Sequence, residues 1–191
     1  MEEEKFDPEN LEKLNNPARL KEFPPNIIIN RLSLKYPKVI IDIGAGTGFY
    51  SVQFAQKFKN SKIYACDISE IMINWMQDNI ITRYNNIFPT LMDDNNVPLD
   101  SKIADFLFTV NLHHELDAPD KMLNEYFRLL MSDGKIAISD WKKMETESGP
   151  PTEYRYEPEE VKSQLMTAGF TNIHIYTDFP SNFLVVGEKS G

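Results

Sequence analysis

Two kinds of apolar pattern alternate along this chain. Short runs rich in β-branched and aromatic residues are typical of buried strands, and apolar residues that recur every three or four positions are typical of helices. The runs predict strands at 39–43, 62–66, 87–92, 104–110, 135–139, 172–179 and 183–188. The helical spacing predicts helices directly after the glycines at 44–48 and at 69–79, 119–131 and 158–168. Strands alternating with helices predict an α/β fold with a mostly parallel sheet, which the last two strands close as a hairpin.

The first 36 residues show a weaker pattern. Leucines between Pro8 and Leu20 give a weak apolar face, which predicts one helix or two short ones, and Pro24-Pro25 interrupts them. Asn26 is a candidate cap for a further helix. We therefore expect residues 1–36 to form a helical segment of packing helices ahead of a domain at 37–191.

Composition and charge restrict the class of protein. The 191 residues are 41% hydrophobic and 12% aromatic, which suffices for one domain with a sizeable core. No apolar run predicts a membrane span, and the acidic start at Met1 lacks the pattern of a signal peptide. Cys66 is the only cysteine, so no internal disulfide is possible and we expect a cytoplasmic location. A net charge of −9 without a basic patch disfavours nucleic acid as a partner.

The clearest candidate chemistry follows the strand at 39–43. Gly44, Gly46 and Gly48 let the backbone approach a ligand closely, and the helix that follows begins with free N–H groups. The spacing departs from the dinucleotide fingerprint, because Phe49 stands where the third glycine of G-x-G-x-x-G is needed for helix–strand packing. Asp42 places a carboxylate at the end of the strand, which suits a cationic, amino-acid-like group better than a pyrophosphate.

Acidic and amide residues follow the next strands at the same edge of the expected sheet. Asp67 comes about twenty residues after the glycines, where an acid can accept hydrogen bonds from ribose hydroxyls. A lone Asp before a helix is more often a helix cap, but the position of Asp67 at a strand end after a glycine turn favours the ligand role. Asp93 and Asp94 offer an acceptor for the exocyclic amine of an adenine, although the local composition also favours a plain acidic turn. Asn111 ends the central strand, where the reacting group of a ligand is expected.

His113, His114 and Glu115 follow Asn111 directly. Adjacent side chains point apart and no second cluster of His or Cys is present, so no metal site is predicted. Histidine titrates near neutral pH, so either His113 or His114 is a candidate general base, and the other is expected to shape the pocket.

A last group of candidates follows the strand at 135–139. Asp140, Trp141 and Lys142 stand at the end that faces the crevice and are candidates for the substrate pocket. The polar segment 144–156 lacks periodicity and is expected to form a loop over the active site.

In their order along the chain, these motifs resemble those of the class I S-adenosylmethionine (SAM) methyltransferases. The resemblance covers roughly residues 35–190 and is nearest to the small-molecule branch, similar to quinone-biosynthesis C-methyltransferases. The sequence Asn-Leu-His-His after the central strand departs from the Asn/Asp-Pro-Pro-aromatic motif of enzymes that methylate base amines. The segments that carry the resemblance are Asp42 with Gly44–Gly48, Ile63–Ser69, Met92–Leu99 and Ala104–His114.

The resemblance implies a Rossmann-like, seven-stranded, mostly parallel sheet with strand order 3-2-1-4-5-7-6, an antiparallel seventh strand and helices on both faces. It also implies transfer of a methyl group from SAM to a small-molecule acceptor, which the sequence does not name, and a lid over the cofactor and substrate formed by residues 1–36, for which ordinary packing helices are the alternative. Two alternatives remain: a methyltransferase-like module that binds SAM or a partner protein without turnover, and an NAD(P)-dependent oxidoreductase, which Phe49 and the terminal hairpin oppose. The residues implied to hold SAM are Asp42, Gly44, Ala45, Gly46, Gly48, Asp67, Ile68, Asp93, Asp94 and Asn111.

Overall fold

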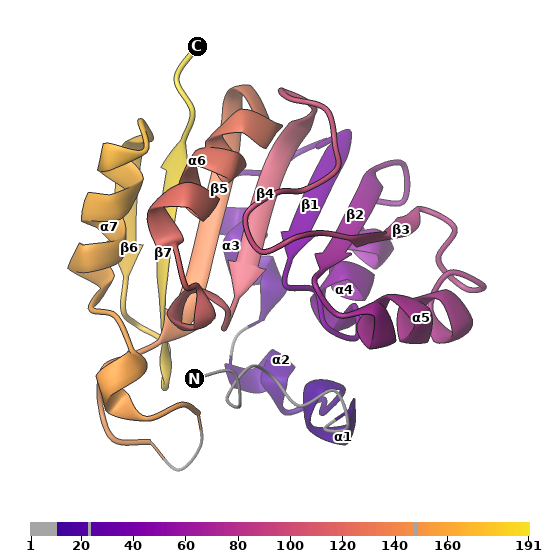
Figure 1. The fold of residues 1–191 in the computed structure, drawn as a ribbon, viewed down its shortest axis with the longest axis horizontal. Coiled ribbons are helices and arrows are strands. Elements are labelled where there is room, and N and C mark those ends of the chain that lie inside the picture. The colour runs from indigo at the N-terminus through magenta and orange to yellow at the C-terminus, as the bar shows by residue number, and fades with distance from the viewer. Residues whose placement is uncertain (1–10, 23, 147–148) are drawn as a thin grey trace.

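A single twisted sheet organises the computed structural model, which describes residues 11–22, 24–146 and 149–191 (Figure 1). The strand order is β3-β2-β1-β4-β5-β7-β6, and β7 runs antiparallel to both of its neighbours while all other pairs are parallel. This confirms the predicted topology. The strands are β1 (Val39–Ile43), β2 (Lys62–Asp67), β3 (Ile87–Leu91), β4 (Ala104–Val110), β5 (Leu130–Trp141), β6 (Thr171–Tyr176) and β7 (Asn182–Glu188).

Helices cover both faces of the sheet. Three of them, α3, α4 and α5, pack on one face, and α6 and α7 pack on the other. The short helices α1 and α2 lie beyond the carboxyl ends of the parallel strands (Figure 1). The helices are α1 (Leu11–Leu14), α2 (Arg19–Glu22), α3 (Pro25–Arg31), α4 (Phe49–Lys57), α5 (Glu70–Asn79), α6 (Pro119–Leu129) and α7 (Pro158–Thr167), with short 3-10 turns η1 (His113–Glu115) and η2 (Thr152–Tyr154).

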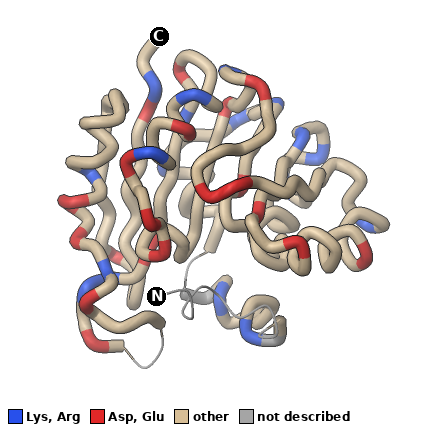
Figure 2. Tube along the Cα trace, in the orientation of Figure 1, with Lys and Arg blue, Asp and Glu red and all other residues tan. Residues whose placement is uncertain are grey.

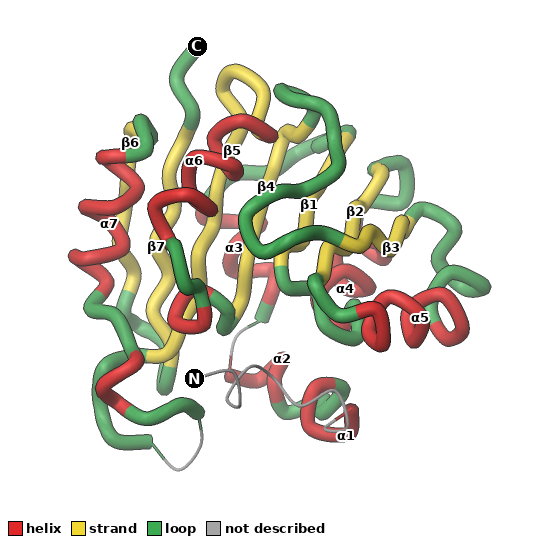
Figure 3. Tube along the Cα trace, viewed as in Figure 1, coloured by secondary structure: helices red, strands yellow, loops and turns green. Residues whose placement is uncertain are grey.

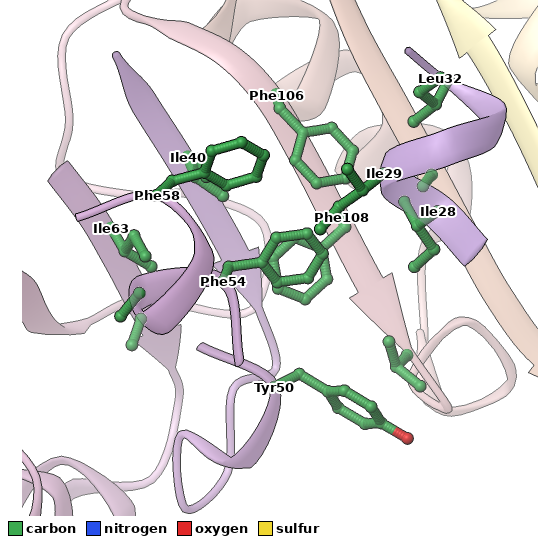
Figure 4. Packing of buried hydrophobic residues seen from close by; sticks show 14 of the residues in the cluster. Ile28, Ile29, Leu32, Ile40, Tyr50, Phe54, Phe58, Ile63, Phe106 and Phe108 are labelled. Atoms are coloured by element: carbon green, nitrogen blue, oxygen red, sulfur yellow. The ribbon is translucent and has the colours of Figure 1, made fainter. Parts of the chain in front are cut away.

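Aromatic packing fixes α4 on the first face. The ring of Phe54 lies 5.6 Å from that of Phe106 and 4.4 Å from that of Phe108, between centroids, and all three side chains are fully buried. Figure 4 shows these rings meeting between α4 and β4, with Ile28 and Ile29 of α3 beside them. This packing holds the glycine turn that precedes α4 against the end of β1.

The second face is covered partly by a loop. Where β3 connects to β4, residues 92–103 run as a loop across the sheet rather than as a helix (Figure 3). Val97 from this β3–β4 loop is 1% exposed and packs in the same cluster as Met122 and Tyr126 of α6. The loop therefore supplies apolar cover that a helix would otherwise provide.

Most element boundaries differ from the predicted ones by a few residues, and one difference is larger. We expected a helix to Met131, a turn at 132–134 and a strand from Lys135, but α6 ends at Leu129 and β5 begins at Leu130. Pairing explains this, because Leu130 pairs with Ala104 of β4 and the N–H of Asp133 donates to the carbonyl of Lys189 at 2.7 Å. Asp133 has φ +64° and the β4–β5 register shifts between Ala104 and Phe106, so the predicted turn survives as an irregularity within the strand.

The prolines behave as positional markers. Pro89 lies in β3, which is an edge strand as predicted, because an edge strand has one side that needs no ladder donor. Pro24 occupies the cap position of α3 and Pro25 its first turn, so Asn26 is not the cap. Within the described ranges, no helix is long and apolar enough to cross a membrane.

Candidate cofactor and substrate site

A cavity of about 690 Å³ opens at the carboxyl ends of the parallel strands, where open α/β sheets bind their ligands. Its volume lies within the usual range for small-molecule sites. The predicted site residues that line it are Asp42, Gly44, Ala45, Gly46, Asp67, Ile68, Asp94, Asn111, His114 and Trp141. The predicted residues that do not line it are Gly48, Asp93, His113, Asp140 and Lys142.

The glycines of the turn have two different roles: Gly46 lines the cavity, and Gly48 packs against α5. Gly46 has φ +55°, and its N–H donates to Oδ2 of Asp67 at 2.7 Å. Gly48 has φ +73° and caps α4, and a Cβ there would lie 3.0 Å from the sulfur of Met76. Gly46 therefore shapes the cavity, whereas the missing side chain of Gly48 leaves room for Met76 of α5 to pack against the turn.

Asp42 is a buried carboxylate at the floor of the cavity. Its side chain is only 3% exposed, and Ser51 donates a hydrogen bond to its Oδ2 at 2.6 Å. Burial raises the pKa of Asp42 to about 7, with the nearby Asp67 adding to the rise and Ser51 and Arg19 opposing it. A cation that entered the cavity would stabilise the ionised form of this carboxylate.

Asp67 ends β2 beside the glycine turn. Its Oδ2 accepts from Gly46, and its Oδ1 accepts from the N–H of Ser69 at 3.0 Å. Burial raises the pKa of Asp67 even though these hydrogen bonds lower it. The cap of α5 is Ser69, whose side chain accepts from the N–H of Met72, so helix capping does not account for Asp67.

The turn after β3 presents one of its two aspartates to the cavity. Asp93 and Asn96 pair across the turn, and the N–H of Asp93 donates to the carbonyl of Asn96 at 3.0 Å. Asp94 and Asn95 form the tip and line the cavity, while Asp93 does not. Ile68, which is 47% exposed, adds an apolar side chain to the lining of the same cavity.

The two histidines have different surroundings. His114 lines the cavity, with its Nδ1 2.8 Å from Oδ1 of Asp140. His113 is fully buried, with its Nε2 2.8 Å from Oε1 of Gln164 and its ring edge-on to Tyr156. Burial lowers the pKa of His113. The geometry thus leaves His114 as the histidine that can reach a ligand.

Asp140 and Lys142, both predicted for the substrate pocket, do not line the cavity. Asp140 is 2% exposed, and each of its carboxylate oxygens forms a hydrogen bond with His114. The Nζ of Lys142 donates to the carbonyl of Phe179, which ties β5 to the hairpin. Trp141, between them in sequence, does line the cavity.

A buried arginine holds part of the expected loop at 144–156, of which 147–148 lie outside the described residues. Arg155 is 5% exposed and donates to the carbonyls of Lys142, Met144 and Pro150 at distances of 2.6–3.0 Å. Gly149 and Pro150 thereby reach the cavity wall beside Trp141. The predicted loop at 144–156 therefore borders the cavity through Gly149 and Pro150.

Sequence patterns missed residues that reach the cavity from remote segments. Arg19, the first residue of α2, lines the cavity with its guanidinium 4.8 Å from the ring centroid of Tyr50. Asn182 at the start of β7 donates from its Nδ2 to Oδ1 of Asn111 at 2.6 Å. Neither residue belongs to a motif, and only the weak helical pattern around Arg19 gave a signal. The part of the expected 1–36 segment that precedes residue 11 lies outside the described residues.

The described residues contain no cluster of three or more His, Cys, Asp or Glu side chains placed to hold a metal ion. The cavity instead combines carboxylates, amides and one histidine with the cationic side chains of Lys13 and Arg19. Such a set suits an organic ligand that carries cationic, anionic and hydroxyl groups.

Comparison with known proteins agrees with this geometry. A protein from Ilyobacter polytropus named malonyl-[acyl-carrier protein] O-methyltransferase 1 is 29% identical over 134 residues, which are 67% of this chain and 49% of that protein. The chain thus spans about half the length of the curated relatives that it matches. The structure of a phosphoethanolamine N-methyltransferase from Haemonchus contortus with bound SAM shares the fold, with a TM-score of 0.73 and 15% identity over 88% of this chain and 53% of that one.

A nearer structural relative covers almost the whole chain. The crystal structure of a SAM-dependent methyltransferase from Aquifex aeolicus matches with a TM-score of 0.90 and 32% identity over 97% of this chain and 100% of that one. The family described as a methyltransferase domain matches residues 40–134. With the strand order and the acidic glycine turn, these matches show that the chain belongs to the SAM-dependent methyltransferases.

Proposed function

We propose that this protein transfers the methyl group of SAM to a small-molecule acceptor inside the cavity. The observation that carries the proposal is the pair of buried carboxylates, Asp42 and Asp67, on either side of the glycine turn. A carboxylate with a pKa near 7 at the floor of a cavity is poised to pair with a cation, and SAM carries both an ammonium and a sulfonium.

The residues present fit the parts of SAM. Asp42 and Arg19 would face its amino-acid end, since one bears a carboxylate and the other a guanidinium in the same cavity. Asp67 retains lone pairs on both oxygens for the ribose hydroxyls. Asp94 at the turn tip, with Ile68 in the same cavity, would hold the adenine. Asn111, at the end of the central strand, would lie nearest the methyl group.

The chemistry asks the protein mainly for alignment. SAM, when bound, supplies an electrophilic methyl group, and the acceptor's lone pair forms the new bond as the carbon–sulfur bond breaks. Orientation of two reactants can contribute on the order of 7–11 kcal/mol to a barrier. Asn111, which accepts a hydrogen bond from Asn182, and Trp141 would orient an acceptor next to His114, since all three line the cavity.

The acceptor is proposed to be small. The cavity is shared between cofactor and acceptor, and its mouth is bordered by α1, α2 and the segment that Arg155 holds. Figure 2 shows Lys and Arg spread over several elements rather than gathered into a stripe, which does not favour a nucleic acid. The single, buried Cys66 is compatible with a cytoplasmic location, which we also propose.

Calorimetric titration with S-adenosylhomocysteine, with NADH as the control ligand, tests the proposal. We expect micromolar binding of the first alone and a loss of at least ~1–3 kcal/mol in Asp67→Ala, the cost of an unmade hydrogen bond to a charged group. Binding of NADH alone would favour an oxidoreductase. Binding of neither would remove the basis for methyl transfer.

Incubation of the protein with SAM and a panel of acceptors then separates an enzyme from a binding module. Formation of S-adenosylhomocysteine that depends on an acceptor is the expected result. SAM binding without turnover on any acceptor class would favour the non-catalytic alternative.

A further inference from the structure

The turn after β3 has Asp94 and Asn95 at its tip and is anchored to the core on the α6 face at Val97. Asp94 and Asn95 line the cavity, and the pairing of Asp93 with Asn96 closes the turn beneath them. The next residue, Val97, is buried in the core on the α6 face. The position of Val97 therefore sets how far the tip reaches into the cavity.

Two side chains of α6 hold both backbone groups of Val97. Its N–H donates to Oε1 of Glu125 at 2.8 Å, and its carbonyl accepts from a terminal nitrogen of Arg128 at 3.1 Å. Arg128 also donates to both carboxylate oxygens of Glu125, each at 2.7 Å. This bidentate pairing fixes the guanidinium in one orientation.

The same arginine extends along the loop. Its other terminal nitrogen donates to the carbonyl of Leu99 at 2.9 Å and to the hydroxyl of Ser101 at 3.0 Å. Arg128 thus spans residues 97–101 in place of the helical hydrogen bonds that this connection lacks. Neither Glu125 nor Arg128 lines the cavity.

We propose that Glu125 and Arg128 are positioning residues for the adenine end of the cofactor site, acting through Val97 on Asp94 and Asn95. The proposal rests on the proposed function. The pair touches no part of the cavity and acts on the ligand only through the turn. Its loss should therefore alter recognition of the base more than recognition of the amino-acid end.

The test compares two ligands that differ in the base. S-adenosylhomocysteine carries the 6-amino group that Asp94 would accept from, and S-inosylhomocysteine carries an oxygen there. We expect the wild-type protein to prefer the adenine ligand. Arg128→Met should weaken binding of S-adenosylhomocysteine about tenfold, the lower end of what loss of an orienting outer partner costs at metal sites, and should reduce the preference between the two ligands.

A matched control separates positioning from general stability. Lys189 is buried and its Nζ donates to the carbonyls of Phe127 and Leu130 at the end of the same helix. Its charge acts on Lys102 of the β3–β4 loop, which lies outside the stretch 97–101 that Arg128 holds. Lys189→Met should lower the unfolding midpoint without changing the preference. If Arg128→Met does not fold, Arg128→Lys and Glu125→Gln keep part of the contact and should give an intermediate preference.

The outcomes are distinct. A wild-type protein that binds neither ligand overturns the proposed function and this inference with it. A wild-type protein that prefers adenine, with an unchanged preference in the Arg128 and Glu125 variants, overturns this inference alone. Equal binding of both ligands by the wild type also overturns it, because the turn then does not recognise the amine.

Discussion

His114 and Asp140 form a buried pair that is joined by two hydrogen bonds. Oδ1 of Asp140 lies 2.8 Å from Nδ1 of His114, and Oδ2 accepts from the His114 main-chain N–H at 2.9 Å. Oε1 of Glu115 lies 3.5 Å from the other ring nitrogen. Burial alone would lower the pKa of His114, but the two carboxylates outweigh it and raise that pKa to about 9. The imidazole is therefore cationic at neutral pH.

This pair predicts how stability depends on pH. A histidine with a folded pKa of about 9 and an ordinary value of 6.5 stabilises the fold fully below pH 6.5, and the contribution is lost as the pH rises through 9. His114→Gln should therefore cost on the order of 2–3 kcal/mol at pH 6 and much less at pH 10. Urea unfolding at the two pH values measures this, with exposed His174→Gln as the control. A cost that has already vanished at pH 7.5 would contradict the raised pKa.

The same pKa constrains catalysis. A cationic His114 cannot accept a proton, so turnover that uses it as a general base should rise with pH until about 9. Asp140→Asn should lower the pKa of His114 and shift the profile to lower pH. Rate profiles of wild type and variant, with a working acceptor, provide the measurement. A flat profile from pH 6 to 9 would leave His114 as a hydrogen-bonding or charge-pairing group.

Ionised Asp42 is expected to lower the stability of the ligand-free protein and to strengthen cofactor binding. Its pKa of about 7 lies above the ordinary 3.8, so its contribution to stability is lost as the pH rises from 3.8 through 7. Asp42→Asn should therefore stabilise the ligand-free protein at pH 8 by on the order of 2–4 kcal/mol and weaken binding of S-adenosylhomocysteine. Unfolding and titration at pH 8 test both, with exposed Asp78→Asn as the control. A destabilised variant at pH 8 would argue against a buried, ionised Asp42.

Arg19 is predicted to recognise the amino-acid end of the cofactor. It lines the cavity, and its guanidinium donates to the carbonyl of Leu14 at 2.6 Å, which fixes its direction. Arg19→Met should weaken S-adenosylhomocysteine about tenfold, the loss of one hydrogen bond to a charged group. Methylthioadenosine, which lacks the amino acid, should bind as before. Exposed Arg83→Met is the control for the change in charge. Equal losses of affinity for both ligands would mean that Arg19 does not recognise the amino-acid end.

Phe54 is predicted to be a main support of the core. It is fully buried between Phe106 and Phe108, so Phe54→Ala leaves a cavity and should cost about 3–5 kcal/mol. Phe88→Ala, on the edge strand and 40% exposed in the folded protein, should cost far less. Denaturant midpoints of the two variants measure the difference. Similar costs would mean that the α4 face can collapse around the missing ring.

Local patterns in the sequence determined the strands and the acidic glycine turn, whereas the order of the strands in the sheet was implied by the resemblance to the methyltransferases. A buried strand repeats its apolar character within a few residues, and Gly46 or Gly48 marks a positive φ that other residues avoid, so both signals are complete within a short stretch. Asp42 and Asp67 were predictable for the same reason, because each lies at the carboxyl end of its own strand. Residues that serve the site from a strand end are therefore visible in the sequence.

Only the tertiary structure decided which side chains meet. His113 and His114 are neighbours with equal claims in the sequence, and the 3-10 turn sends one into the core and the other to the cavity. Asn182 reaches Asn111 across 71 positions, and Arg128 holds the loop at Val97 across 31. No local pattern encodes such pairs, because the free energy of each contact exists only once the sheet has brought distant segments together.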